Sequence, residues 1–174
     1  YPAHEFSIYA GSNNRLINGV VYNVDKIIVH EQYSSGYNYD LALLRISRDI
    51  KFNSRVQSIA LDPQEIKNGT QVKILGWGRL AAKGSGSAML MKNTVTVLDE
   101  NMCFQVSGYK RPDMLCLSHP LDNGSCYGDS GSGAVYNGKL IGVASFILDD
   151  CGSKYPDGYS KISHNYNWIM RNMV

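Results

Sequence analysis

Short apolar or alternating runs, each followed by turn residues, recur along most of this chain. The runs are rich in Val, Ile, Thr and Tyr and are bounded by Asn, Gly, Asp or Pro, a pattern typical of β-strands. It predicts strands over 6–9, 20–24, 26–29, 41–46, 71–75, 93–98, 133–136 and 140–147. Between the last two, Asn137-Gly138 predicts a two-residue hairpin turn, because both residue types tolerate positive φ.

Helical patterns are confined to two short stretches. In residues 163–172, Ser163 is a candidate N-cap and Arg171 falls in the last turn, with apolar residues at helical spacing between them. Residues 99–104 are a candidate for a second, short helix. Many short strands with one terminal helix predict an all-β barrel or sandwich. The polar run 61–69 predicts a connection between two halves.

The composition is that of a folded, water-soluble protein. The chain has 174 residues, of which 44% are hydrophobic and 18% charged, and its formal charge is +2. This length is enough to bury a core in one large domain or two small ones. No apolar run approaches the roughly 18 residues that a membrane span needs. So small a charge does not suggest nucleic acid as the main partner. We therefore expect neither a membrane nor a nucleic acid as a partner.

Four cysteines lie in the second half of the chain: Cys103, Cys116, Cys126 and Cys151. Their spacing differs from the close pairs of a zinc site, and no histidine cluster accompanies them. An even number of cysteines, with little charge and many Tyr, Gly, Asn and Ser, fits two disulfides in a secreted protein. The alternative is four reduced, buried thiols in a cytosolic protein. The cysteines favour a secreted, extracellular protein without a metal site.

The stretch Cys126-Tyr-Gly-Asp-Ser-Gly-Ser-Gly133 carries the candidate chemistry. A serine hydroxyl is a poor nucleophile unless a base takes its proton and backbone N–H groups stabilise the oxyanion it creates. Gly128 allows a close approach to a substrate carbonyl, so the N–H groups of Gly128 and Ser130 can form one oxyanion hole. The alternative interpretation is a surface loop rich in Gly and Ser.

Further motifs occur in one order around this stretch. They are Tyr39-Asp40-Leu-Ala-Leu-Leu-Arg-Ile46, Leu75-Gly-Trp-Gly78, Cys103 with Cys116, Gly128-Asp-Ser-Gly131, Ser145 before Cys151, and Tyr155-Pro-Asp-Gly-Tyr159 before Trp168. Together they resemble the trypsin/chymotrypsin family of serine endopeptidases from one end of the chain to the other. Within that family, Phe6-Ser-Ile-Tyr9 and the run 26–33 look most like mite digestive proteases.

The resemblance implies the catalytic roles. Ser130 becomes the nucleophile, and Asp40 the buried carboxylate that orients the base. Asp129 becomes the partner of the N-terminal amine that activation cleavage creates, an ion pair that orders the oxyanion hole. The resemblance also pairs Cys103 with Cys116 and Cys126 with Cys151, the second pair bracing the wall of the substrate pocket.

The catalytic histidine of the family is the part of the pattern that this chain lacks. It belongs to an Ala-Ala-His-Cys segment, and the chain begins just after the corresponding point. His4 lies too close to the strand at 6–9 and lacks the neighbouring cysteine, and His30 falls at a strand end that we expect to be exposed. His119 and His164 are expected on a loop and at a helix start. A base from an upstream segment or chain of the same protein is therefore expected.

The substrate pocket implied by the resemblance departs from the usual pattern. It is lined by Gly124, Ser125, Tyr127, Ser145, Phe146, Ile147 and Asp157. Gly124 leaves the base of the pocket uncharged, Ile147 narrows the entrance where glycine is usual, and Asp157 can supply a negative charge for Lys or Arg. Ordinary specificity drift and loss of function are both compatible with these changes.

The resemblance implies two antiparallel six-stranded barrels, the first incomplete in this chain, with a C-terminal helix. The expected divisions are 1–62, 63–162 and 163–174. The expected function is that of a secreted serine endopeptidase acting on protein or peptide substrates through an acyl-enzyme, with no cofactor. The alternative is a catalytically inactive paralogue, like those of parasitic mites, that binds or inhibits another protein. The intact Ser130 and Asp40 favour the enzyme, while Ile147, Asp149 and Asp150 favour the alternative.

Overall fold

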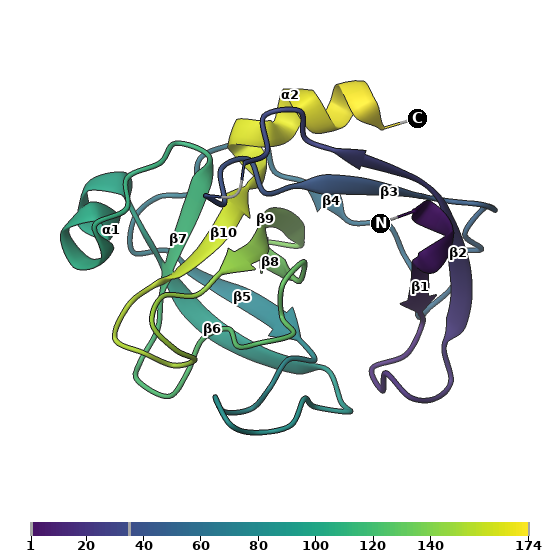
Figure 1. The fold of residues 1–174 in the computed structure, drawn as a ribbon, viewed down its shortest axis with the longest axis horizontal. Coiled ribbons are helices and arrows are strands. Elements are labelled where there is room, and N and C mark those ends of the chain that lie inside the picture. Colours follow the sequence, from purple (N-terminus) through teal and green to yellow (C-terminus); the bar gives the residue numbers. More distant parts are fainter. Residues whose placement is uncertain (1, 35, 174) are drawn as a thin grey trace.

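The computed structural model describes residues 2–34 and 36–173, so the outer ends of the expected divisions at 1 and 174 lie outside the described residues (Figure 1). Three antiparallel strands form the first sheet, in the order β1-β2-β3. Their bounds are β1 Ser7–Ala10, β2 Val20–Val29 and β3 Ala42–Ile46. The two runs predicted at 20–24 and 26–29 are one strand, whose register shifts at Asp25 between Val24 and Lys26. A short 3-10 helix, Ala3–Glu5, precedes this sheet.

The second sheet closes on itself. It contains β4 Ala60–Leu61, β5 Gln71–Gly76, β6 Met91–Leu98, β7 Met114–Ser118, β8 Gly133–Tyr136, β9 Lys139–Phe146 and β10 Asp157–Lys161. The order β10-β7-β6-β5-β8-β9, with β10 also paired to β9, makes a closed six-stranded barrel, and β4 adds to β9 in parallel. The prediction of one complete and one incomplete barrel is confirmed. The hairpin turn at Asn137-Gly138 is confirmed as well, since both residues have positive φ between β8 and β9.

Two strands of the barrel were missing from the predicted set. All but the last residue of β7 is buried, so its sequence Met-Leu-Cys-Leu-Ser shows no alternation. All five residues of β10 are buried, although they include Asp157, Ser160 and Lys161. Polar side chains in β10 have partners elsewhere in the chain, His119 for Asp157, Asp40 O for Ser160 and Glu65 for Lys161, and a hydrophobicity pattern cannot reveal such partners.

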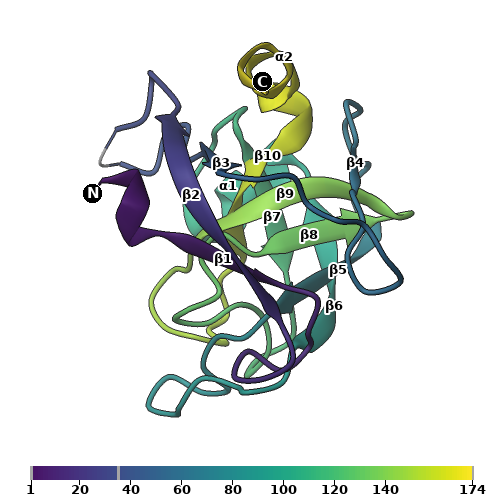
Figure 2. The same cartoon turned by 90° about the vertical axis from the view of Figure 1, so that its right-hand side faces the viewer.

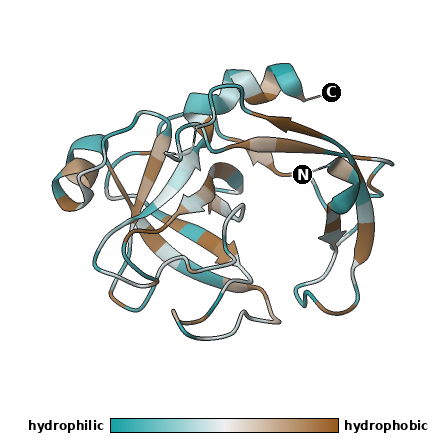
Figure 3. Ribbon diagram, viewed as in Figure 1, coloured by the Kyte–Doolittle hydropathy of each residue, from teal (hydrophilic) through white to brown (hydrophobic). Residues whose placement is uncertain are grey.

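The core lies inside the barrel. Strand β5 alternates between exposed and buried positions, which directs Val72 and Ile74 inward against Val95, Val97 and Leu117. Figure 3 shows these hydrophobic stretches along the barrel strands, and further hydrophobic residues along β2 and β3. In the first sheet, by contrast, large apolar side chains are exposed on all three strands: Phe6 just before β1, Tyr9, Val20, Val21, Val29 and Leu44.

Helix α2, Ile162–Asn172, covers the junction between the two sheets (Figures 1 and 2). Its Trp168 and Ile169 pack with Leu41, and with partly buried side chains of β2, β3 and β9. The predicted cap at Ser163 is wrong: Lys161 is the N-cap, and Ser163 Oγ instead donates a hydrogen bond to Glu65.

The second helix confirms the prediction at 99–104. Helix α1, Glu100–Ser107, is capped by the side chain of Asp99, which accepts a hydrogen bond from Met102 N. None of the helices in the described part of the chain combines the length and hydropathy that crossing a membrane requires.

Candidate functional site

The turn that carries Ser130 presents two backbone N–H groups without partners. Tyr127 O accepts a hydrogen bond from Arg79 N at 2.9 Å. In a trans peptide the C=O and N–H groups point to opposite sides, so this bond directs Gly128 N–H away from Arg79. Within residues 2–34 and 36–173, neither Gly128 N nor Ser130 N has a hydrogen-bond partner. Gly128 has φ +94°, a conformation that favours glycine.

The carboxylate of Asp129 faces Gly76, Gly78 and Cys126. Its Oδ1 accepts from Gly78 N at 2.8 Å, and its Oδ2 from Cys126 N at 3.0 Å. A Cβ at Gly76 or Gly78 would overlap the carboxylate, which explains glycine on both sides of Trp77. Asp129 and Gly124 line one cavity of about 220 Å³. No cation within the described residues forms an ion pair with Asp129.

Asp40 joins the first sheet to the barrel. Its Oδ2 accepts a hydrogen bond from Ser145 Oγ at 2.6 Å, and its backbone oxygen accepts one from Ser160 Oγ. Ser145 lies on β9 and Ser160 on β10, so both barrel strands hold the aspartate. Asp40 and Ser130 line the same cavity, which measures about 710 Å³ and is otherwise mostly apolar. No histidine of the described chain lines it.

A salt bridge between Arg111 and Asp113 holds the loop that leads into Asp40. Their side chains meet at 2.7 Å and are 15% and 7% exposed. The Arg111 guanidinium donates to the carbonyls of Gly36 and Tyr37, and Asp113 Oδ2 accepts from Tyr39 N at 2.8 Å. We call these two residues the loop clamp.

The loop clamp stabilises an unfavourable backbone conformation. Tyr37 and Tyr39 have φ +61° and +49°, a left-handed conformation that costs roughly 1–2 kcal/mol for each non-glycine residue. The clamp holds each tyrosine through its backbone: Arg111 donates to Tyr37 O, and Asp113 accepts from Tyr39 N. Because Tyr39 directly precedes Asp40, the clamp also fixes the backbone position from which the Asp40 side chain extends. Sequence reasoning missed both clamp residues, since their partners lie some 74 residues away.

Replacing Asp113 by asparagine should destabilise the protein in a pH-dependent way. Burial would raise the pKa of Asp113, but hydrogen bonds from Arg111 and Tyr39 N outweigh burial and hold the pKa below its ordinary 3.8. Because the pKa of Asp113 is lower in the folded state, the charged carboxylate stabilises the fold at pH values above 3.8. This contribution disappears as the pH falls through the pKa of the folded state. We expect Asp113→Asn to lower the free energy of unfolding by about 1–3 kcal/mol at neutral pH. Urea unfolding should show this difference shrinking in strong acid; a pH-independent difference would contradict the role of the charge.

The predicted pocket residues divide into two groups. Ser125, Tyr127, Ser145, Phe146 and Ile147 line one small cavity of about 50 Å³ that also contains Ser130. Two others do not line it. Gly124 lines the neighbouring cavity with Asp129, and the Asp157 side chain is only 3% exposed.

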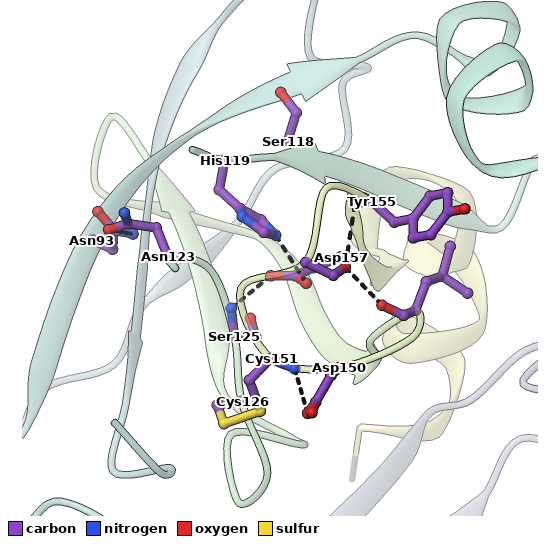
Figure 4. Close-up of polar contacts among 12 residues, drawn as sticks. Asn93, Ser118, His119, Asn123, Ser125, Cys126, Asp150, Cys151, Tyr155 and Asp157 are labelled. Carbon is purple, nitrogen blue, oxygen red and sulfur yellow. Dashed lines mark hydrogen bonds and ion pairs between the residues drawn. A yellow bond between two sulfur atoms is a disulfide. The ribbon is translucent and has the colours of Figure 1, made fainter. Parts of the chain in front are cut away.

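The two disulfides implied by the resemblance are confirmed, and the alternative of four reduced thiols is wrong. Cys103–Cys116 ties α1 to β7. Cys126–Cys151 ties the turn before Ser130 to the loop after β9, beside the small cavity (Figure 4). The second disulfide therefore braces the wall that bears Tyr127 against the loop that follows Ile147.

His30 corrects one expectation. We predicted an exposed side chain, but His30 is only 5% exposed. Its ring stacks between those of Tyr39 and Trp168, at 4.7 and 4.5 Å, and its Nδ1 accepts from Gln32 N. Burial lowers the pKa of His30, consistent with a neutral ring in this stack. His119 follows β7 in a loop and His164 lies in the first turn of α2, as expected.

Comparison with known proteins agrees with this architecture. The chain is similar to "Serine protease SP24D" of Anopheles gambiae, with 38% identity over 99% of the chain and 62% of that protein. It is 30% identical to "Chymotrypsin-2" of Vespa crabro over 98% of the chain and 79% of that protein. Its fold matches a solved structure of neuropsin, a serine protease of mouse brain, with a TM-score of 0.90 and 25% identity, covering 97% of this chain and 79% of that one.

The chain thus spans less than two thirds of the length of the mosquito protease. A sequence model of the trypsin family matches residues 2–169, which include both sheets, the Ser130 turn and most of α2. The barrel, the two disulfides and this match together establish that the chain belongs to the trypsin family of serine proteases.

Proposed function

We propose that this chain is the larger part of a secreted serine endopeptidase that cleaves peptide bonds through an acyl-enzyme at Ser130. The observation that carries the proposal is that the N–H groups of Gly128 and Ser130, beside the Ser130 hydroxyl, have no hydrogen-bond partner among the described residues. Two such donors can stabilise the oxyanion that forms when a serine attacks a peptide carbonyl. Trypsin-family membership and the two disulfides, which are usual in secreted proteins, support the same assignment.

In the proposed reaction, Ser130 Oγ attacks the substrate carbonyl while a base takes its proton. The tetrahedral oxyanion accepts hydrogen bonds from Gly128 N–H and Ser130 N–H. The base then gives its proton to the leaving amine, and an ester remains on Ser130. In the second half of the reaction the base takes a proton from water, which attacks the ester carbonyl. The base then returns the proton to Ser130 Oγ as the carboxylic acid product leaves. Asp40, held by Ser145, orients the base and stabilises its protonated form.

The base in this proposal is a histidine outside the 174 residues. The cavity shared by Asp40 and Ser130 has no histidine lining it within the described chain. The ring of His30 is stacked between two aromatic rings, and His119 is paired with Asp157. Asp40 Oδ1 has no hydrogen bond to the described residues, which leaves it available for an imidazole N–H.

The first sheet offers a surface on which an upstream segment of the same protein can pack. Large apolar side chains are exposed on each of its strands, among them Val20, Val29 and Leu44. Large apolar side chains left exposed along one sheet are what an interface with another segment would cover. We propose that the segment bearing the base completes this sheet as a barrel and covers the cavity above Ser130.

Asp129 has a separate role in the proposal. Its carboxylate lies in a cavity of about 220 Å³ without a cation partner in the described chain. Asp129 is half-buried, and a new N-terminal amine would add a cation to the two backbone N–H groups that its carboxylate already accepts. We propose that activation cleavage supplies this amine and so stabilises the turn from Cys126 to Ser130.

The decisive experiment is peptide hydrolysis by the full-length protein after activation cleavage. It should hydrolyse members of a peptide library, and replacement of the upstream histidine by alanine should abolish that hydrolysis. The matched control, His30→Ala, should reduce stability without abolishing turnover. Absence of hydrolysis by the activated protein would contradict the proposal.

One observation favours a second candidate, a catalytically inactive member of the family that binds or inhibits another protein. The small cavity beside Ser130 measures only about 50 Å³, and Ile147 contributes to its lining. A pocket this narrow limits the substrate side chains that can enter. The narrower likeness to mite proteases, which include inactive members, stays a prediction.

Replacing Ile147 by glycine should distinguish a narrow pocket from a blocked one. We expect the substitution to enlarge the cavity and to raise kcat/KM for long side chains by about tenfold or more, because a branched side chain is removed from the entrance. The control substitution Ile147→Val, which removes one methylene, should have a much smaller effect. Unchanged kinetics for Ile147→Gly would contradict the blocking role of Ile147.

A further inference from the structure

A buried ion pair is joined by one hydrogen bond to the lining of the small cavity that contains Ser130. His119 Nε2 is 3.3 Å from Asp157 Oδ1, and the two side chains are 1% and 3% exposed. The other carboxylate oxygen, Oδ2, accepts a hydrogen bond from Ser125 N at 2.6 Å. Figure 4 shows His119 and Ser125 meeting the Asp157 carboxylate from neighbouring segments. Because Ser125 lines the cavity, only this hydrogen bond separates the pair from the pocket lining.

The hydrogen bonds of the imidazole determine its charge. Nδ1 lies 3.0 Å from Pro120 O, and Nε2 contacts the Asp157 carboxylate. A backbone carbonyl and an ionised carboxylate can only accept hydrogen bonds. Donation to both acceptors requires a proton on each ring nitrogen, so this geometry favours the imidazolium form. Burial alone would lower the pKa of His119, but the hydrogen bonds to Asp157 and Pro120 O outweigh burial and raise it.

The backbone is shaped around this pair. Gly124 has φ +94°, and a Cβ there would lie 2.5 Å from the His119 ring and 2.8 Å from Asp157 Oδ2. Any larger residue would displace the imidazole from the carboxylate. Of the charged groups in the described chain, only His119 forms an ion pair with Asp157. Tyr159, on β10 beside Asp157, donates to or accepts from Ser125 Oγ, and its raised pKa keeps the hydroxyl neutral.

We infer that His119 is a specificity-determining residue: its positive charge neutralises Asp157 beside the pocket lining, so the pocket favours an uncharged substrate side chain over Lys or Arg. The effect on substrate preference rests on the proposed protease function, whereas the ion pair is present in the structure whatever the function. It changes the interpretation of Asp157, whose sequence position alone suggested a negative charge available to the substrate.

The protonation state can be measured without catalysis. Full-length protein carrying ¹⁵N-labelled histidine should show, at neutral pH, both nitrogens of His119 protonated. The Asp157→Asn variant should lose this signature, because its amide no longer stabilises the imidazolium. A neutral His119 ring in the wild-type protein would overturn the inference.

Specificity is tested with two peptides that differ only in arginine or citrulline at the cleaved residue, since citrulline is a neutral analogue of nearly the same shape. The changes at His119 and Asp157 are made both in the wild type and in Ile147→Gly, whose enlarged cavity admits these long side chains. The activated wild-type protein should cleave both with kcat/KM values within about threefold. In His119→Gln the uncompensated carboxylate should raise the preference for arginine by about tenfold or more. The double variant His119→Gln/Asp157→Asn should return to the wild-type ratio.

The two proposals fail in different ways. A wild-type preference for arginine of about a hundredfold, or no change when His119→Gln is added to Ile147→Gly, would overturn the specificity role while leaving the protease assignment intact. Failure of the activated protein to cleave any peptide, with His119 still an imidazolium, would contradict the protease assignment and its specificity consequence, while supporting the charge pair.

Discussion

Replacing Ser130 by alanine in the full-length, activated protein should lower kcat for a peptide amide by roughly 10⁴-fold or more. The hydroxyl is the group that forms the acyl-enzyme, and a methyl group cannot form that bond. The N–H groups of Gly128 and Ser130 stay in place in this variant, so a small residual rate above the uncatalysed reaction should remain. Steady-state hydrolysis of a chromogenic peptide amide measures the change.

The neighbouring Ser132 provides a matched control. It lies two residues beyond Ser130 in the same turn, where its N–H donates to Asp129 O. Ser132→Ala should fold equally well and keep kcat within about threefold of the wild type. If Ser130→Ala and Ser132→Ala lost the same amount of activity, hydrolysis would not proceed through Ser130.

Removing the Cys126–Cys151 disulfide should give the largest loss of stability among the changes considered. The bridge closes a loop with a sequence separation of 25 residues, and the chain-entropy relation predicts a loss of about 3.5 kcal/mol in the free energy of unfolding. The double substitution Cys126→Ala/Cys151→Ala also releases the turn before Ser130 from the loop that follows Ile147. We therefore expect a fall in kcat/KM as well, measured together with urea unfolding.

The other disulfide is the natural comparison. Cys103–Cys116 has a sequence separation of 13 and should contribute about 3 kcal/mol by the same relation. It joins α1 to β7 and lines a different cavity from the one that contains Ser130. Cys103→Ala/Cys116→Ala should cost similar stability but leave kcat/KM of the folded fraction unchanged. Equal losses of activity in the two variants would show that the Cys126–Cys151 bridge has no special role at the pocket.

Much of the barrel could be predicted because its strands follow simple rules. Strand β5 alternates in burial, the Asn137-Gly138 turn has the backbone that its residue types favour, and Asp99 caps α1 as a short polar side chain should. Strand β10 could not be predicted in this way. Its polar residues are buried by partners elsewhere in the chain, as Asp157 is by His119 and Ser160 by Asp40.

In the candidate site, too, the residues of a local motif could be predicted and the contacts between distant residues could not. Ser130, Asp129 and Gly128 are contiguous in a motif, so local sequence was enough to single them out. The loop clamp binds backbone groups of a segment 74 residues away in the sequence, and the His119–Asp157 pair joins residues 38 apart. Neither Arg111 nor His119 belongs to a local pattern, and the sign of the charge beside the pocket depends on a contact that only the fold creates.

Covalent labelling of Ser130 tests the central claim most directly. A fluorophosphonate reacts with a serine only when a base activates the hydroxyl and the oxyanion hole is formed. The full-length protein, after activation cleavage, should be labelled at Ser130, as located by mass spectrometry of the peptide containing Cys126–Gly133, and Ser130→Ala should not. An activated, folded protein with its upstream segment in place that leaves Ser130 unlabelled would contradict the assignment of this chain to a working protease.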